Sequence, residues 1–97
     1  MFEVVFTESA VADLHFLKKT AQNVVLDAID QQLAMEPLVE TRNRKPLRPN
    51  DLSSWEARVG THRIFYDVDE AEQKVTIKAV GWKKHNKLFI RGKEYEL

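Results

Sequence analysis

The sequence predicts an α+β fold, in which an N-terminal strand and an α-helical hairpin are followed by antiparallel strands that form a twisted sheet packed by the helices. Two patterns indicate this fold. Apolar residues recur at every third or fourth position before Pro37, and apolar and polar residues alternate after Trp55. The chain has 97 residues, of which 43% are hydrophobic, enough for one modest core. We therefore predict a single domain over residues 1–97.

The first predicted element is a short strand over residues 2–6. Thr7 follows as the N-cap of a helix that ends near residues 18–19, because its hydroxyl can accept an amide of the first helical turn. Thr20 caps a second helix that ends before Pro37, since proline cannot occupy a helix interior. The apolar positions expected to face the sheet are Ala10, Val11, Leu14, Phe16 and Leu17, then Val24, Val25, Ala28, Ile29, Leu33 and Ala34.

Residues 55–68 form two alternating runs joined at Gly60-Thr61, a pattern that predicts a β-hairpin. With a two-residue loop, Arg58 lies directly opposite Arg63. One face of the hairpin is apolar and suits the core, and it carries Trp55, Ala57, Val59, His62, Ile64, Tyr66 and Val68. The other face is mostly charged and carries Glu56, Arg58, Arg63, Phe65 and Asp67.

The facing arginines need an explanation, because like charges opposite each other destabilise a sheet. An anion bound between Arg58 and Arg63 is one explanation. The alternative is a solvated pair of arginines that Glu56 and Asp67 neutralise. A glycine bulge at Gly60 would shift the register by one residue and remove the pairing.

The remaining strands are expected on either side of this hairpin. Residues 45–49 contain two prolines and predict only a short or edge strand before a loop. Residues 82–91 are predicted as a basic, aromatic tail that leaves the sheet edge, so about four strands follow the helices. Residues 74–81 predict a strand with an inner and an outer face, the inner one formed by Val75, Ile77 and Ala79 and the arginine side by Thr76, Lys78 and Val80.

The formal net charge of zero hides a sorted distribution along the chain. Residues 1–40 carry a net charge of −5, residues 42–63 carry +4 and residues 78–93 carry +6. Such sorting can present a surface that attracts a polyanion. The alternative is that pairing of charges within the fold cancels it.

Several classes of site find no support in the sequence. There is no cysteine, and hence no disulfide framework or thiolate zinc site. No His, Asp and Glu residues have metal-ligand spacing, and no glycine-rich phosphate loop or nucleophile elbow is present. We therefore expect no metal and no cofactor. The chain shows no basic leader and no apolar run long enough for a membrane span, which favours a cytoplasmic protein without a membrane partner.

The basic segments contain aromatic residues, a combination that suits RNA because cations hold phosphates and aromatic rings stack on unpaired bases. The candidate RNA-binding residues are Lys45, Arg48, Lys78, Trp82, Lys84, Lys87 and Phe89. The alternative for the aromatic members is packing, since Trp82 and Phe89 neighbour Leu88 and Ile90 in a segment that could dock on the sheet.

The order of elements and three motifs resemble the RelE/ParE superfamily of bacterial toxins, over essentially the whole chain. The motifs are Lys45-Pro46-Leu47, residues 52–66 with Trp55, Arg58, Gly60, Arg63 and Tyr66, and Ala79-Val80-Gly81-Trp82-Lys83-Lys84. In the RelE-like branch, the resemblance implies metal-independent cleavage of mRNA in the ribosomal A site that leaves a 2′,3′-cyclic phosphate. In another branch the same scaffold inhibits gyrase.

The resemblance also implies roles for individual residues. Arg63 matches a phosphate-binding arginine, Arg58 provides a second cation, and Lys83 matches a basic position after the strand-end glycine. Glu56 is a candidate base, and His85 is a candidate acid or base because its ordinary pKa lies near neutrality.

The sequence departs from the family pattern at several of these positions. Ser54 and Glu56 stand where RelE-like members have two lysines, and Lys45 stands where other members have a catalytic glutamate. Phe89 falls where some members use a tyrosine, and a phenylalanine cannot transfer a proton. These differences keep two alternatives open, a ParE-like gyrase inhibitor and a catalytically degenerate homologue that binds an antitoxin.

The resemblance implies a cognate antitoxin as partner in either case, and a toxin-antitoxin hetero-oligomer. An extended or helical segment of the antitoxin, often acidic, would cover the basic face or displace the tail.

Overall fold

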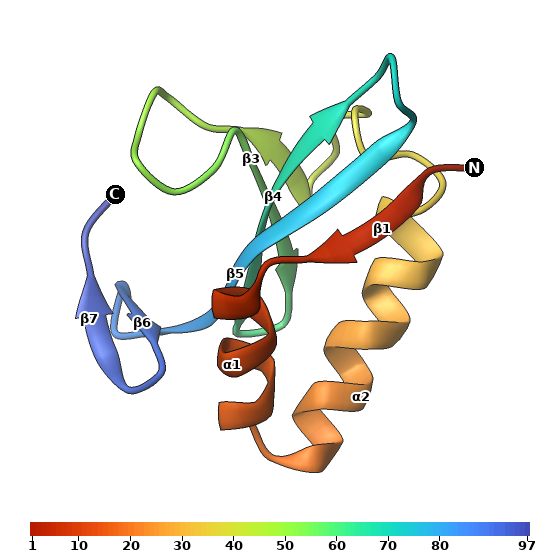
Figure 1. The fold of residues 1–97 in the computed structure, drawn as a ribbon. Coiled ribbons are helices and arrows are strands. Elements are labelled where there is room, and N and C mark those ends of the chain that lie inside the picture. Colours follow the sequence, from red (N-terminus) through yellow and green to blue (C-terminus); the bar gives the residue numbers. More distant parts are fainter.

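The computed structural model describes residues 1–97 and confirms the predicted α+β class, with two helices against a seven-stranded sheet (Figure 1). The strand order is β2-β3-β4-β5-β6-β7, all neighbours being antiparallel, and β1 pairs with β5 in parallel. β4 pairs with one edge of β5. The other edge of β5 pairs with β1 along the first residues of β5 and with β6 along its last residues. The elements are β1 Glu3–Phe6, α1 Glu8–Phe16, α2 Lys19–Ala28 with a π-helical extension Ile29–Leu33, β2 Arg44–Pro46, β3 Trp55–Val59, β4 His62–Asp69, β5 Lys74–Lys84, β6 Lys87–Ile90 and β7 Lys93–Tyr95.

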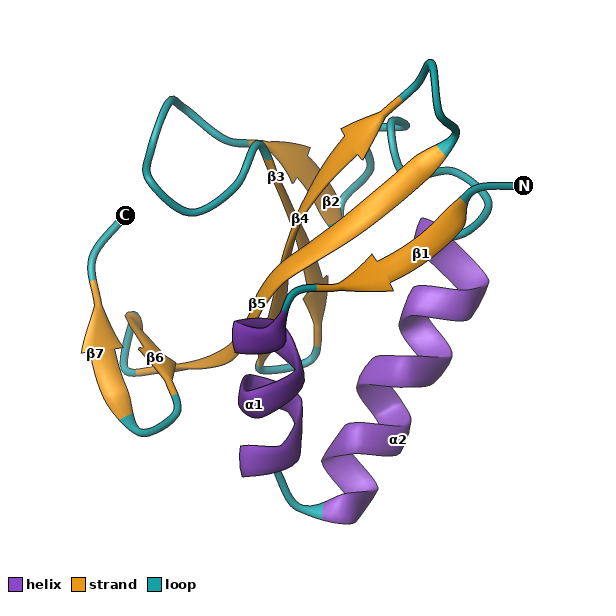
Figure 2. Ribbon diagram, viewed as in Figure 1, coloured by secondary structure: helices purple, strands orange, loops and turns teal.

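The two helices form where the sequence predicts them (Figure 2), but the start of α2 and the exposure of three apolar residues differ from the prediction. Thr7 is the N-cap of α1, and its Oγ1 accepts a hydrogen bond from the Ala10 amide at 3.0 Å. Thr20 lies inside the first turn of α2, whose N-cap is Lys18 without a side-chain bond. Three apolar residues expected to face the sheet are exposed instead, Val11 by 39%, Phe16 by 55% and Val24 by 49%.

The hairpin of β3 and β4 has the predicted register, with Arg58 opposite Arg63 and Val59 opposite His62. Gly60 has a φ of 59°, whereas Thr61 has no positive φ, a combination that fits a type II′ turn. The register is therefore not shifted by a bulge at Gly60. Ala57, Ile64 and Tyr66 face the helices in the main core, as the alternation predicts.

A β-bulge in β5 overturns the predicted faces of that strand. Phe65 pairs with Ala79 while Tyr66 pairs with Ile77, so Lys78 is an extra residue without a partner on β4. The alternation therefore switches at Lys78. Ala79, predicted to face inward, packs with Phe65 on the side of the arginines, and Val80, predicted to face the arginines, joins the main core.

The predicted tail is instead a continuation of the sheet, so six strands follow the helices rather than about four. β5 extends to Lys84, and two tight hairpins then form β6 and β7. Both turns are of type I′, because φ is positive at His85 (54°) and Asn86 (65°) and again at Arg91 (50°) and Gly92 (78°). Sequence patterning misses these turns, since only the second contains a glycine.

The sheet is buried on both faces. The helices cover one face over a core that contains Leu14, Val25, Ile64, Tyr66 and Ile77 among twelve buried residues. On the opposite face, a smaller cluster of Phe65, Ala79 and Leu88 is covered by the loop of residues 47–54 and by the C-terminal hairpin, through Leu47, Leu52, Ile90 and Tyr95. No helix is long and apolar enough to cross a membrane.

Candidate functional site

Arg58 and Arg63 lie opposite each other on the face of the sheet that the helices do not cover, which we call the arginine face. Arg58 is exposed, whereas only 9% of Arg63 is exposed. Nη1 of Arg63 donates hydrogen bonds to the carbonyl oxygens of Gly60 and His62, both at 2.9 Å, and so ties the guanidinium to the β3–β4 turn. Burial lowers the pKa of Arg63, the charge of Arg58 lowers it further, and Glu56 opposes the shift.

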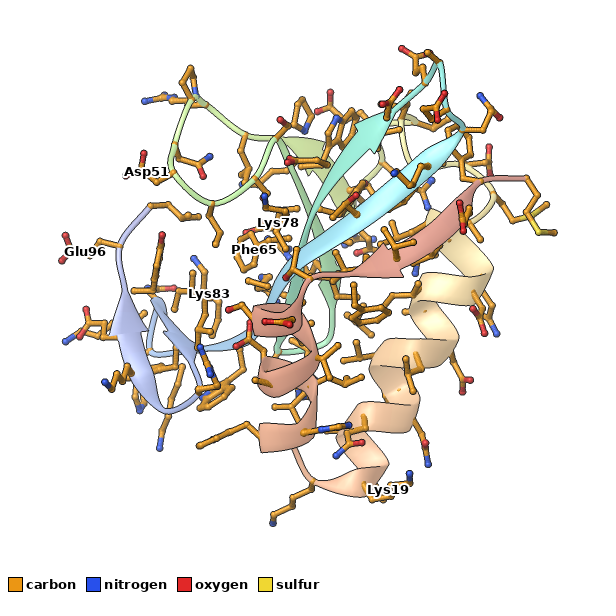
Figure 3. The ribbon with its side chains drawn as sticks, viewed as in Figure 1. Lys19, Asp51, Phe65, Lys78, Lys83 and Glu96 are labelled. Carbon is orange, nitrogen blue, oxygen red and sulfur yellow. The ribbon has the colours of Figure 1, made fainter.

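Lys83 joins the arginines at the same end of the sheet. Its amide donates to the Thr61 carbonyl at 2.8 Å, which holds the end of β5 against the β3–β4 turn. Gly81 is the register partner of Arg63, and strand alternation puts Lys83, two residues later, on the same face. His85 follows roughly 7 Å farther along, at the tip of the β5–β6 turn. In Figure 3, Lys83 lies on the side of the sheet that faces the C-terminal hairpin.

None of the three cations of this cluster forms an ion pair. The structure contains four ion pairs, and none of them includes Arg58, Arg63 or Lys83. Neither carboxylate proposed to neutralise the arginines does so by an ion pair. Glu56 is buried and lies 4.0 Å from Lys45 Nζ, and Asp67 lies 4.0 Å from Lys78 Nζ and accepts the Ser54 amide at 2.7 Å. The arginine face is therefore suited to hold an anion.

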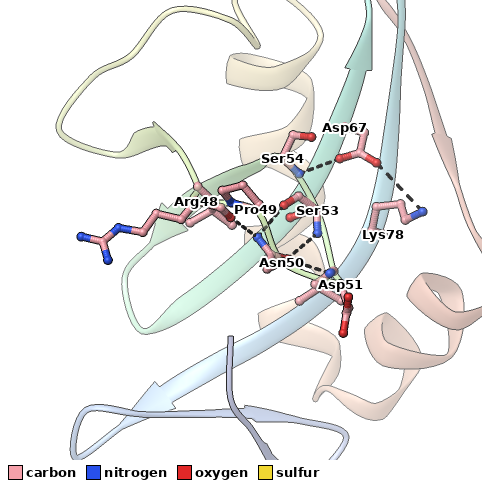
Figure 4. Close-up of a pocket in the computed structure, with 10 residues that line it drawn as sticks. Arg48, Pro49, Asn50, Asp51, Ser53, Ser54, Asp67 and Lys78 are labelled. Carbon is pink, nitrogen blue, oxygen red and sulfur yellow. Dashed lines mark hydrogen bonds and ion pairs between the residues drawn. The ribbon is translucent and has the colours of Figure 1, made fainter.

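A pocket of about 430 Å³ lies between the loop of residues 47–54 and the Asp67–Lys78 pair, toward the end of the β3–β4 hairpin that is opposite its turn, and none of the three cations lines it (Figure 4). Asn50 organises the loop. Its Oδ1 accepts the amides of Leu52 (2.7 Å) and Ser53 (3.0 Å), and its Nδ2 donates to the carbonyls of Arg48 (2.7 Å) and Ser53 (2.9 Å). Arg48 and Lys78, both candidate RNA-binding residues, line this pocket. Asn50 was not among the predicted residues, although an Asn after a proline in a polar loop is a usual signal for such a turn.

Trp82 and Phe89, both candidate RNA-binding residues, do not lie on the arginine face. They are register partners, and Trp82 stacks on Phe16 of α1, so both rings lie on the side of the helices. Lys84 and Lys87 are also register partners and lie on this side. Lys87 Nζ is 3.9 Å from Glu94.

Tyr95 lies on the arginine face and was not among the predicted site residues, because the strand that carries it, β7, was not predicted. It pairs with Leu88, which in turn pairs with Lys83. Its side chain is half-buried against the cluster of Phe65, Ala79 and Leu88 and lines a hollow that Lys83 also lines. Tyr95 therefore brings a phenol to the arginine face, although Phe89 stands at the position where some family members have a tyrosine.

Comparison with known sequences connects this fold to a family of toxins. Residues 4–86 match the family model of the ParE toxin of the type II toxin-antitoxin system parDE. Toxin RelG of Mycobacterium tuberculosis is 35% identical over 79 residues, which are 81% of this chain and 87% of the relative.

Comparison with solved structures gives the same result. The toxin-antitoxin complex RelBE2 of Mycobacterium tuberculosis contains a chain with a TM-score of 0.75 and 34% identity, and the match covers 84% of this chain and 91% of that one. The archaeal RelE-RelB complex of Pyrococcus horikoshii matches with a TM-score of 0.69 over 87% of this chain and 97% of its own. At 21% identity this second likeness concerns the fold alone.

Proposed function

Because the chain belongs to the RelE/ParE superfamily of type II toxin-antitoxin toxins, we propose that it is a ribosome-dependent mRNA endoribonuclease that inhibits translation. The observation that carries this proposal is the cluster of Arg58, Arg63 and Lys83, three cations at one end of the sheet, none of which forms an ion pair. In the proposed reaction the substrate is mRNA in the ribosomal A site, and the cations hold its scissile phosphate.

The proposed reaction is an internal transesterification of RNA. The 2′-oxygen forms a bond to phosphorus and loses its proton, while the bond from phosphorus to the 5′-oxygen breaks and that oxygen gains a proton. The products are a 2′,3′-cyclic phosphate and a 5′-hydroxyl. The negative charge that develops on the phosphorane is stabilised by cations held in place before the reaction.

Arg63 can perform this role while it holds the turn. A guanidinium has five N–H donors, and Nη1 uses its two on the carbonyls of Gly60 and His62. The N–H groups on Nε and Nη2 therefore stay available for phosphate oxygens. The bonds to the turn fix the direction of the fork, which is the preorganisation that electrostatic catalysis uses.

We assign the proton transfers to the titratable side chains that flank the cations. Glu56 lies two residues before Arg58 on β3 and is the candidate base, and His85 lies two residues after Lys83 and is the candidate acid. Tyr95 is a further donor on the same face. Lys45, whose Nζ lies 4.0 Å from Glu56, contributes to phosphate binding.

A second candidate function is inhibition of gyrase, and the observation that favours it is the match of residues 4–86 to the ParE toxin model. A third is a degenerate homologue that only binds an antitoxin, which the departures at Ser54, Glu56 and Phe89 favour. In all three cases we propose a cognate antitoxin as partner, because the solved relatives are toxin-antitoxin complexes.

Induced expression in bacteria without the antitoxin tests the proposal. Protein and DNA synthesis are followed by isotope incorporation. The ends of mRNA are mapped with and without ribosomes. Cleavage that appears only in translated mRNA supports the proposal. Arrest of DNA synthesis with intact mRNA supports the gyrase inhibitor instead, and the absence of any effect supports the degenerate homologue.

A further inference from the structure

Three aromatic rings from three elements form a continuous stack on the side of the sheet that faces the helices. Phe16 of α1 lies 5.9 Å from Trp82 of β5 at an interplanar angle of 15°, and Trp82 lies 6.1 Å from Phe89 of β6 at 19°. Trp82 is therefore the middle ring. Residues far apart in the sequence meet here in nearly parallel planes, the arrangement that nucleobases adopt among themselves.

Phe16 is the outer ring on the α1 side of this stack, and it is exposed although the buried core does not require a ring there. Phe16 is 55% exposed and belongs to neither of the two buried clusters. An exposed ring gains little from burial, so its place at the end of the stack is not explained by the stability of the core. The edge of the ring rests on Gly92, where a Cβ would come within 3.3 Å of Cζ, so the β6–β7 turn keeps the ring in position.

The surroundings of Phe16 are basic. Lys18 and Lys19 lie two and three residues after Phe16 and are exposed, and Lys84 and Lys87 lie at the strand ends on the same side as Trp82. Two carboxylates are also near this surface, and each has a basic partner: Glu94 lies 3.9 Å from Lys87, and Asp13 lies 2.9 Å from Arg91. The lysines at positions 18, 19 and 84 form no ion pair in the structure.

We propose that Phe16 is the exposed step of a stacking platform for an unpaired RNA base, a second RNA contact on the opposite side of the sheet from Arg58, Arg63 and Lys83. Lys18, Lys19 and Lys84 hold the phosphates next to that base. A single exposed ring amid unpaired cations suits one base and its backbone, because a stable protein interface buries a far larger apolar area. The inference rests on the proposed function and names a second RNA segment as its partner.

The two faces have different tasks. The sheet separates the platform from the arginine face, so a base on Phe16 is not the nucleotide whose phosphate lies at Arg63. The platform then contributes to affinity for the RNA target and leaves the cleavage step unchanged. Its loss is expected to raise KM without lowering kcat, whereas the loss of Arg63 lowers kcat.

Binding of the full chain to two fluorescein-labelled RNA probes tests the platform by anisotropy. One probe is an oligoadenylate, and the other is an abasic strand of equal length, which has the same phosphates and no bases. Phe16→Leu keeps an apolar side chain without a stacking ring, and Phe16→Tyr keeps the ring. We expect Phe16→Leu to bind oligoadenylate roughly 5- to 150-fold more weakly and the abasic strand equally well, and Phe16→Tyr to match the wild type.

The binding test at Phe16 and the cleavage test at Arg63 can fail independently of each other. Arg63→Ala is expected to abolish cleavage. In an Arg63→Ala background, Phe16→Leu should still bind oligoadenylate more weakly than Phe16→Tyr does. The same difference in affinity would persist if the chain proved to be no nuclease. Equal affinity of Phe16→Leu and the wild type for oligoadenylate would overturn the platform. So would an equal loss on both probes, or a loss of antitoxin binding alone, which would make Phe16 a protein contact. Circular dichroism melting shows that each variant is folded.

Discussion

Asp13 of α1 has a buried carboxylate, which forms an ion pair with Arg91, whose Nε lies 2.9 Å from Oδ1. The other oxygen accepts a hydrogen bond from the Val80 amide at 3.1 Å, just after the bulge of β5. One side chain therefore connects the first helix, the bulged strand and the β6–β7 turn. Oδ1 has no other partner, so the buried carboxylate is stabilised by one cation, Arg91, and by the Val80 amide.

Replacement of Arg91 tests this connection. Arg91→Met removes the cation and leaves the buried Asp13 carboxylate with only the Val80 amide as a donor. Because Arg91 is half exposed, we expect a loss of about 1–3 kcal/mol, below the range for a fully buried pair. Urea denaturation measures the free energy of unfolding. Arg91→Lys keeps the charge and is expected to lose less. Equal stability of Arg91→Met and the wild type would show that water compensates Asp13 instead.

The pH dependence of stability tests the burial of Asp13. Burial raises the pKa of Asp13 from its ordinary value of 3.8, while the Val80 amide and Arg91 oppose the shift. The folded chain then binds this proton more tightly than the unfolded chain does. The contribution of Asp13 to the free energy of unfolding is therefore greatest below the unfolded pKa and decreases as pH rises through the folded pKa.

Comparison with Asp13→Asn isolates this contribution, because the amide does not titrate. The free energy of unfolding of the wild type minus that of Asp13→Asn should decrease from roughly pH 3 to roughly pH 7. Urea titrations at several pH values measure it. A difference that grows with pH would mean that Arg91 and the Val80 amide outweigh burial.

Gly81 is required because β6 passes directly against it. A Cβ at this position would lie 2.3 Å from the Phe89 carbonyl oxygen, which is backbone and cannot move aside alone. We expect Gly81→Ala to cost about 1–3 kcal/mol or to displace the C-terminal hairpin. Thermal melting measures the loss. Gly60→Asn is the matched control, since a Cβ at Gly60 would meet nothing within 4 Å and asparagine tolerates the positive φ. A similar small loss in both variants would contradict the steric reason.

The sequence predicts those parts of the fold that depend on local pattern. The two alternating runs around Gly60-Thr61 were sufficient to predict the register of the hairpin, and hence that Arg58 lies opposite Arg63. The bulge at Lys78 has no such signal, because an extra residue in one strand becomes visible only against its partner strand. Its consequence is large, since it exchanges the faces of Ala79 and Val80.

The site was predicted in part for the same reason. Arg58, Arg63 and Lys83 do lie together, because their positions follow from a hairpin and one neighbouring strand. Trp82 and Phe89 were proposed as RNA-binding residues from the basic, aromatic composition of residues 82–91, and strand alternation puts them on the face opposite the arginines. The ion pair of Asp13 with Arg91 joins residues at opposite ends of the chain, and neither has a local pattern that indicates the other.

Arg63 has a structural contact as well as a proposed catalytic one, so its replacement needs a matched variant. Arg63→Ala leaves the carbonyls of Gly60 and His62 without Nη1, and we expect a stability loss of about 1 kcal/mol because water can reach an exposed turn. Arg58→Ala removes the opposite cation, which donates no side-chain hydrogen bond, and relieves the repulsion that lowers the pKa of Arg63. It should therefore fold at least as well as the wild type.

If the two arginines hold the scissile phosphate together, both variants lose mRNA cleavage and toxicity while only Arg63→Ala loses stability. Growth after induction and the melting temperature of the purified variants measure the two properties separately. Toxicity that follows the melting temperature, with Arg58→Ala fully toxic and Arg63→Ala impaired, would mean that Arg63 acts only through the turn. The opposition of two like charges in the sheet would then have no anion to explain it, and the proposed phosphate site would have to be abandoned.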